Sequence, residues 1–298
     1  MPSITSTQIA NVYFNLTSQS NHRSHKPQKC LHRLLQKLRR LFQRASAGRQ
    51  TLFLPYICLG YPNYKASLES AKAALRAGAA ALELGVPFSD PIADGPTLQK
   101  ATHLSLQNGT KFADVFRMIR DLRQSGFQQP LLVMTYLNLV EQWGWEEFAA
   151  ALARSGGDGA IIPDLPLEQF PFFKPFLQKE NLSLIPFVAP TSTAQRAKLA
   201  DAQDAPFLYY VSVTGVTGAR KSLPSELLPA LRSLKRRIKT PLVVGFGIST
   251  PGQAAQVGKV ADGVIIASAL VQLISKTPVG RIGKAVEAYC RQVVRALH

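Results

Sequence analysis

Short apolar runs alternate with helical stretches along most of the chain, and this alternation restricts the possible folds more than any other feature. Eight runs have the composition of buried strands, and each is followed by a stretch whose apolar residues recur at helical spacing. The predicted strands are Thr51–Ile57, Ala80–Leu84, Pro130–Met134, Gly159–Ile162, Leu182–Val188, Phe207–Ser212, Pro241–Phe246 and Gly263–Ile266. The predicted helices are Tyr64–Ala77, Lys111–Arg123, Trp145–Arg154, Leu167–Lys179, Thr193–Ala200, Pro224–Arg237, Thr250–Val260 and Val279–Ala296. Because no linker interrupts the series, we predict an α/β chain folded as a (β/α)8 barrel, the TIM-barrel architecture.

A doubly wound parallel sheet is the alternative that the same alternation allows. Such a sheet would carry a glycine-rich fingerprint after an early strand. The one candidate, Gly245-Phe246-Gly247-Ile248-Ser249, comes late in the chain and lacks the third glycine. The barrel is therefore the favoured interpretation.

The beginning of the chain differs in composition from the rest. Residues 1–30 are rich in Ser, Thr, Asn and Gln, contain no acidic residue and show no sustained hydrophobic period. The net charge of +17 is concentrated near this end, because ten Lys and Arg residues precede Glu69, the first acidic residue. We predict a disordered basic leader over 1–30 and a barrel domain over 31–298. The leader is either a transit peptide into the chloroplast (plastid stroma) or a basic tail on a protein of the bacterial cytoplasm.

Helical spacing begins at Leu31 and continues to Phe42, with Arg and Lys on the opposite face, and Ala45–Gly48 ends the pattern. We expect this helix to cover one end of the barrel; the alternative is a helix lying on a membrane surface. No apolar run is long enough to cross a bilayer, so no membrane partner is expected. The possible metal ligands near this helix are His22, His25, Cys30 and His32. They lack the fixed spacing of a metal site, so none is expected.

The segment Leu82–Thr97 carries the residues that point most strongly to chemistry. Glu83 interrupts an otherwise apolar run, and a carboxylate buried there needs a strong partner or a chemical role to offset the cost. Asp94 lies in the loop that follows, and long loops after strands are where catalytic groups concentrate. The residues expected to exclude regular structure from this loop are Pro87, Pro91, Gly95 and Pro96. The alternative is a surface loop whose aspartates cap turns.

Other polar residues follow or end predicted strands, at the edge where barrel enzymes bind substrates. Asn138 follows the third strand, Asp164 the fourth, and Tyr209 lies in the sixth. Each has a structural alternative: Asn138 as a loop cap, Asp164 as the cap of the next helix, and Tyr209 as a core residue with its hydroxyl satisfied.

Three segments have the composition of an anion-binding site. They are Thr214–Ser222, Gly245–Ser249 and Ala267–Ala269, which follow the last three predicted strands. The last of them opens a short helical run to Ile274. Glycine lets backbone N–H groups approach an anion, and a helix N-terminus adds partial positive charge. Since barrels recurrently bind phosphate after strands seven and eight, we predict a phosphorylated substrate.

The contiguous segment Glu83–Thr97 resembles the signature of the tryptophan synthase alpha chain family. Further matching segments are Leu54–Pro62, Met134–Asn138, Pro163–Pro166, Tyr209–Gly218 and Gly245–Ser249. The resemblance runs from about Leu38 to the C-terminus. It implies a (β/α)8 barrel that splits indole-3-glycerol phosphate into indole and glyceraldehyde 3-phosphate in tryptophan biosynthesis. It also implies that the indole passes to a beta chain in an alpha2-beta2 heterotetramer.

The same resemblance assigns roles to individual residues. It implies that Glu83 and Asp94 form a catalytic pair and that Tyr209 supports them. The residues it assigns to substrate binding are Tyr56, Phe246, Thr217, Gly218, Gly247, Ala267 and Ser268. Tyr56 and Phe246 would form walls of the indole pocket, and the others would lie at the phosphate. Two residues depart from the family: Ala267 stands where glycine is usual, and Cys58 where threonine is frequent. A backbone N–H contact survives the first change, so weaker or adjusted phosphate binding is expected.

A retro-aldol cleavage requires a proton donor at indole C3, tolerance of positive charge on the ring nitrogen, and a base for the side-chain hydroxyl. Burial raises a carboxyl pKa, which suits Glu83 to the acid and base roles. Asp94, in a more polar loop, should stay ionised and stabilise the ring N–H. No cofactor or metal is signalled. The rivals are a stand-alone lyase that releases indole and, more remotely, a basic nucleic-acid-binding protein, for which no motif is found.

Overall fold

The fold is that of a computed structural model, which describes residues 36–211, 222–245 and 247–298. The predicted leader 1–30, the possible metal ligands up to His32 and the first residues of the covering helix lie outside the described residues. So do most of the segment Thr214–Ser222, with Thr217 and Gly218, and the predicted pocket residue Phe246.

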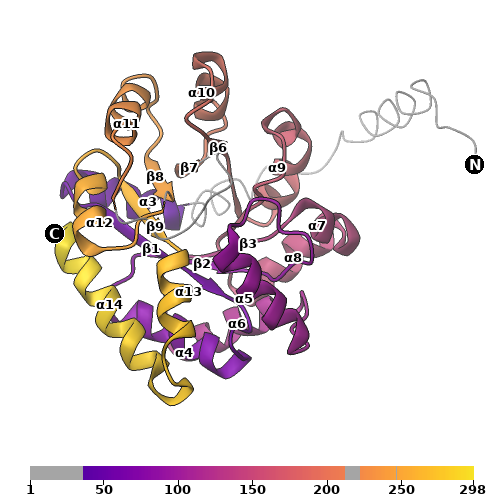
Figure 1. Cartoon of the computed structure of the whole chain (residues 1–298). Helices are drawn as coiled ribbons and strands as arrows, with labels where there is room; N and C mark the ends of the chain where they lie inside the picture. Colours follow the sequence, from indigo (N-terminus) through magenta and orange to yellow (C-terminus); the bar gives the residue numbers. More distant parts are fainter. Residues whose placement is uncertain (1–35, 212–221, 246) are drawn as a thin grey trace, which may run out of the picture. The chain divides into compact units, whose positions relative to one another are not determined.

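In the part of the chain that the structure describes, nine parallel strands form one sheet that is nearly closed into a barrel (Figure 1). They are β1 (Leu52–Cys58), β2 (Leu82–Gly85), β3 (Leu131–Met134), β4 (Gly159–Ile161), β5 (Ser183–Ile185), β6 (Phe187–Val188), β7 (Leu208–Val211), β8 (Leu242–Gly245) and β9 (Gly263–Ile266). Their order in the sheet is β5-β4-β3-β2-β1-β9-β8-β7-β6, so the first strand pairs with the last. The predicted barrel is confirmed, and the doubly wound alternative is excluded.

The predicted fifth strand, Leu182–Val188, is two strands in the structure. Pro186 separates β5 from β6, and proline has no N–H to donate to a neighbouring strand. The chain changes partners here: β5 pairs with β4, and β6 pairs with β7. The Pro186 carbonyl still accepts a hydrogen bond of 3.0 Å from Tyr209 N. β5 and β6 are the two end strands of the sheet, and Pro186 connects them along the chain.

Helices surround the strands (Figure 1). Those that confirm predicted helices are α4 (Tyr64–Arg76), α6 (Asp114–Gln124), α8 (Trp145–Ser155), α9 (Phe170–Lys179), α10 (Ala194–Asp201), α11 (Leu227–Lys235), α12 (Pro251–Gly258), α13 (Ser268–Ser275) and α14 (Ile282–Leu297). Short 3-10 turns, η1 (Leu167–Gln169) and η2 (Val279–Arg281), precede α9 and α14. The first and last barrel helices, α4 and α14, pack side by side, so the helical layer closes where β1 meets β9.

Among the described residues, two helices were not predicted, and one of them corrects the interpretation of the proline-rich loop. Pro96 does not exclude regular structure: it is the first residue of α5 (Pro96–Gln107), with Gly95 as the N-cap. Proline suits this position because its missing N–H would have no intrahelical acceptor. The other helix, α7 (Leu137–Trp143), has only seven residues, too few to show a clear period in the sequence.

The helix α3 (Gln36–Ala47) covers the N-terminal end of the barrel, as predicted. Leu38 and Phe42 are buried, and the Phe42 ring lies 5.2 Å from that of Phe207, just before β7. Lys37 forms an ion pair of 3.5 Å with Asp158, just before β4. No helix within the described part of the chain is both long enough and apolar enough to cross a membrane.

Candidate active site

A cavity of about 230 Å³ opens at the C-terminal ends of the strands. Its lining residues are Tyr56, Glu83, Ile92, Ala93, Asp94, Leu98, Met134, Ile161, Pro163, Phe187, Tyr209, Val211, Gly245, Gly247, Ile248, Ile265, Ala267 and Ser268. Every described residue to which the family resemblance assigned catalysis or substrate binding is among them. The barrel thus brings to one cavity residues that the sequence scatters from the first strand to the last.

Glu83 projects from β2 into the floor of this cavity. Its backbone is fixed on both sides, in register with Tyr56 of β1 and Leu132 of β3. The side chain is 3 % exposed, and the Tyr209 hydroxyl donates a hydrogen bond of 3.2 Å to Glu83 Oε2. Burial raises the pKa of Glu83 to about 8; the Tyr209 hydrogen bond lowers this pKa, and the nearby Asp94 charge raises it. Glu83 therefore holds a proton through much of the neutral range.

Asp94 enters the cavity from the loop between β2 and α5. Burial raises the pKa of Asp94 to about 6. The hydrogen bond with the Tyr136 hydroxyl lowers this pKa, but by less than burial raises it. The surroundings are thus less polar than the sequence suggested. The pKa values of Glu83 and Asp94 nevertheless stay about two units apart, so at neutral pH one carboxyl is mainly protonated and the other mainly ionised.

Tyr136 is a contact of Asp94 that the sequence analysis did not single out. It lies two residues after the end of β3, is 1 % exposed, and its hydroxyl accepts a hydrogen bond of 3.2 Å from Ala93 N. Its ring stacks on Phe88, with centroids 5.0 Å apart. The sequence feature that could have identified Tyr136 is a polar aromatic residue just after a buried strand, because barrel active sites lie at the ends of strands.

Two glycines make room for the tyrosines of the cavity. A Cβ added at Gly85 would lie 2.0 Å from the Tyr56 hydroxyl, and one added at Gly245 would lie 2.6 Å from the Tyr209 ring and hydroxyl. No side chain larger than hydrogen fits at either strand end without displacing a cavity tyrosine. Both glycines are therefore required by packing; neither has a positive φ.

The described parts of the predicted anion site also face the cavity. Gly247, with a φ of 59°, follows β8, and Ala267 and Ser268 follow β9. Ala267 is the N-cap of α13 and Ser268 is its first residue, 7 % exposed. The N–H groups and partial positive charge of a helix N-terminus therefore lie at the rim of the cavity.

The remaining wall of the cavity is apolar. The aliphatic and proline side chains in it are Leu98, Met134, Ile161, Pro163, Val211, Ile248 and Ile265. Phe187 of β6 stacks on Tyr209, with centroids 5.0 Å apart and planes at 20°. Phe187 was not predicted as a site residue, because the whole of Leu182–Val188 has the composition of one core strand. The combination of apolar walls and few polar groups suits a flat aromatic ligand.

Two other predicted polar residues lie outside the cavity. Asn138 is exposed on α7. Asp164 accepts hydrogen bonds from Leu137 N at 2.9 and 3.1 Å, so it caps α7 and not the helix that follows it in the sequence. Across the described residues, no group of three or more His, Cys, Asp and Glu side chains is arranged to hold a metal ion.

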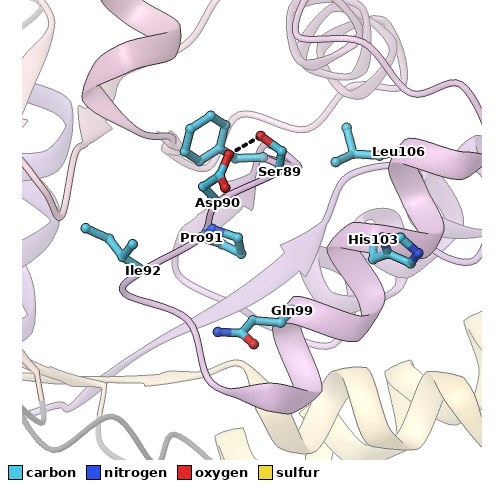
Figure 2. Close-up of a pocket in the computed structure, with 8 residues that line it drawn as sticks. Ser89, Asp90, Pro91, Ile92, Gln99, His103 and Leu106 are labelled. Carbon is cyan, nitrogen blue, oxygen red and sulfur yellow. Dashed lines mark hydrogen bonds between the residues drawn. The ribbon is translucent and has the colours of Figure 1, made fainter.

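A second hollow lies on the outer side of the Asp94 loop (Figure 2). Ser89, Asp90, Pro91 and Ile92 form one side of it, and the Ser89 hydroxyl donates a hydrogen bond to Asp90. Ile92 also lines the central cavity, although its side chain is 80 % exposed. This loop is therefore a thin wall between the cavity and the surface.

Comparison with known proteins identifies the family of this chain. The sequence profile of the tryptophan synthase alpha chain matches residues 42–296. The alpha chain of Chloroflexus aurantiacus is 42 % identical over 256 residues, which are 86 % of this chain and 96 % of that one. The alpha chain of Aquifex aeolicus is 40 % identical over 247 residues, 83 % and 94 % of the two chains.

Solved structures agree with the sequence relatives. A structure of Mycobacterium tuberculosis tryptophan synthase matches with a TM-score of 0.80 and 32 % identity, covering 88 % of this chain and 98 % of that one. A tryptophan synthase alpha subunit from Legionella pneumophila matches with a TM-score of 0.79 and 34 % identity, again over 88 % and 98 %. The chain belongs to the tryptophan synthase alpha chain family.

Proposed function

We propose that this alpha subunit cleaves indole-3-glycerol phosphate to indole and glyceraldehyde 3-phosphate, acting as a carbon–carbon lyase. One observation carries the proposal: Glu83 and Asp94, with pKa values of about 8 and 6, face one apolar cavity whose rim is the N-terminus of α13. An acid, an anion and an anion-binding rim are the three groups that this cleavage needs.

Glu83 acts first as the acid and then as the base. Its proton is transferred to indole C3, and the ring nitrogen becomes positively charged. The carboxylate then removes the proton of the hydroxyl on the adjacent side-chain carbon. The O–H electrons form the aldehyde C=O, the C–C bond breaks, and its electron pair returns to the ring and neutralises the nitrogen. Glu83 ends protonated, as it began. Positioned proton transfer of this kind contributes about 10²- to 10⁴-fold to a rate.

Asp94 and Tyr209 support these proton transfers. The ionised Asp94 stabilises the ring N–H while positive charge develops there. Tyr209 holds the Glu83 carboxyl in place through their 3.2 Å hydrogen bond. Because that bond lowers the pKa of Glu83, it also keeps the proton transferable at neutral pH.

The rest of the cavity holds the substrate. We assign Tyr56, together with Phe246, to the walls around the indole ring. We assign the phosphate to the backbone N–H groups at the residues Thr217, Gly218, Gly247, Ala267 and Ser268. The methyl group of Ala267 leaves its N–H available, so the departure from glycine adjusts this site without removing it.

The partner is a tryptophan synthase beta chain, which receives the indole. Family membership supports this assignment over a stand-alone lyase. The nucleic-acid alternative has no comparable support, because the sequence contains no nucleic-acid-binding motif.

The test is an assay of the purified chain with indole-3-glycerol phosphate, alone and with a beta chain, following indole and glyceraldehyde 3-phosphate separately. We expect equal amounts of both products from the chain alone, and faster release of glyceraldehyde 3-phosphate when the beta chain is present. A rate unaffected by any beta chain, with full activity alone, would support the stand-alone lyase. No cleavage under either condition would contradict the proposed reaction.

A further inference from the structure

We propose that Tyr136 is a positioning residue that holds the Asp94 carboxyl in place by fixing the loop before it. The inference rests on the proposed function, because it assigns to Tyr136 a role in the reaction that Asp94 serves. Tyr136 does not line the cavity, so it acts through Asp94 and not on the substrate.

Tyr136 is itself held firmly. It is the N-cap residue of α7, two residues after the end of β3, and it is 1 % exposed. The next residue, Leu137, donates its N–H to both oxygens of Asp164, at 2.9 and 3.1 Å. Asp164 comes from the end of β4, so the backbone at Tyr136 is tied to two neighbouring strands of the barrel. These hydrogen bonds therefore hold the backbone that carries the Tyr136 side chain in a fixed position.

The Tyr136 side chain contacts the Asp94 loop at both ends. Its ring stacks on Phe88, near the start of the loop, with centroids 5.0 Å apart and planes at 30°. Its hydroxyl accepts the 3.2 Å hydrogen bond from Ala93 N and lies beside the Asp94 carboxyl. The path of the loop between these contacts is drawn in Figure 2.

The other hydrogen bonds that we find for residues 90–94, in the described part of the chain, stay within the loop or come from α5. Ile92 N donates to Asp90 O at 2.9 Å, and Asp94 N donates to Pro91 O at 3.0 Å. Gln99 of α5 donates its side-chain N–H to Asp94 O at 2.8 Å. None of these joins the loop to another strand end. Tyr136 therefore supplies the connection between the loop and the barrel.

The charge state of Asp94 depends on the same contact. The titratable groups that interact with this carboxyl in the described structure are Tyr56 and Cys58 of β1, Glu83 of β2, Tyr136, and Tyr209 of β7. Burial raises the pKa of Asp94, and the Tyr136 hydroxyl is the group that lowers it. Without this hydroxyl the pKa rises further, and a smaller fraction of Asp94 is ionised at neutral pH.

The test compares Tyr136→Phe with Tyr64→Phe. Tyr64 is a matched control, because its hydroxyl also donates to an aspartate, Asp121 Oδ2 at 2.7 Å, but between the outer helices α4 and α6. We expect Tyr136→Phe to lower kcat about 10- to 100-fold, the effect of one hydrogen bond to a charged group, with little change in KM. The acid limb of its kcat–pH profile should move to higher pH. Tyr64→Phe should leave kcat and both limbs unchanged.

Asp94→Asn, alone and combined with Tyr136→Phe, separates this inference from the proposed function. If Tyr136 acts through Asp94, adding Tyr136→Phe to Asp94→Asn should change kcat less than about twofold. If Asp94→Asn keeps wild-type kcat, the proposed function fails. If Asp94→Asn loses activity but Tyr136→Phe keeps the wild-type kcat and acid limb, only the positioning role is overturned. A lower thermal midpoint for Tyr136→Phe, with kcat per folded molecule preserved, would likewise assign Tyr136 to stability alone.

Discussion

The Tyr209 hydroxyl reaches across the barrel to Glu83, 126 positions earlier in the sequence, and donates to its Oε2 atom at 3.2 Å. Tyr209 lies on β7 and Glu83 on β2, four places apart in the strand order, so the bond spans the interior. It forms the polar floor of an otherwise apolar cavity.

Glu83→Gln keeps the size of the side chain but cannot transfer a proton. We expect kcat to fall by at least about 10², the lower end of general acid–base catalysis, while KM barely changes because the substrate contacts lie elsewhere. Steady-state kinetics with indole-3-glycerol phosphate measure both constants. A kcat near that of the wild type would rule out Glu83 as the acid.

Although Glu83→Gln should lower kcat, it should raise the stability of the fold at high pH. The folded pKa of about 8 lies above the ordinary value of 4.5, so protonated Glu83 stabilises the fold fully below pH 4.5, and this stability is lost as pH rises through 8. The loss is on the order of 5 kcal/mol. A glutamine side chain does not titrate, so Glu83→Gln should match the wild type near pH 4.5 and unfold at a higher temperature above pH 8. A variant that is less stable at both pH values would indicate a structural role for the carboxylate.

Asp94→Asn should also lower kcat, through lost electrostatic stabilisation of the ring N–H. If Asp94 and Glu83 act on one transition state, the double variant Glu83→Gln/Asp94→Asn should lose less than the product of the two single effects. In the wild type, kcat should fall as pH drops through about 6, where Asp94 becomes protonated, and as pH rises through about 8, where Glu83 loses its proton. Loss of the acid limb in Asp94→Asn would identify Asp94 as its source; an unchanged limb would exclude it.

Ser268→Asp places a negative charge at the first residue of α13, where we assign the phosphate. We expect KM to rise far more than kcat falls. Ser275→Asp, at the last residue of the same helix, adds the same charge about 10 Å away and should leave KM unchanged. Equal KM values for the two variants would remove the α13 N-terminus from the phosphate site.

Gly85→Ala should destabilise the protein and displace Tyr56. The added Cβ would lie 2.0 Å from the Tyr56 hydroxyl and 2.2 Å from ring atom Cζ, and overpacking typically costs about 1–3 kcal/mol. Because ring carbons are involved, Tyr56→Phe should not rescue the variant. Gly252→Ala, where no heavy atom lies within 4 Å, is the control and should be neutral or slightly stabilising. Unfolding curves of the three variants test this, and equal stability for the two alanine variants would contradict the packing role.

Deleting residues 1–30 should leave folding and lyase activity intact, because this stretch has no core-forming period and the family match begins at residue 42. Circular dichroism and the cleavage assay measure both properties, and a truncated chain that fails to fold would make the leader structural. If the leader is a transit peptide, the protein isolated from its source should begin downstream of Met1. A mass spectrum that shows intact Met1 would refute cleavage of the leader and leave the basic tail as the remaining interpretation.

The sequence alone predicted the barrel, most of its helices, and Glu83 and Asp94 as the site. These features are local: apolar runs and helical periods repeat along the chain, and a carboxylate inside an apolar run is visible without coordinates. The sequence was interpreted wrongly at positions where one residue type is compatible with two kinds of local structure. Pro96 was taken to break regular structure but begins α5, and Pro186 divides a run that reads as one strand.

Only the tertiary structure could show which distant residues meet. Tyr209 reaches Glu83 because closure of the sheet sets β7 opposite β2 and the register fixes which side chains point inward. Tyr136 meets Asp94, and Phe187 stacks on Tyr209, for the same reason. The pKa values of about 8 and 6 also depend on burial by residues from many strands. A sequence records which groups a chain contains, but their distances and desolvation arise only when the barrel closes around them.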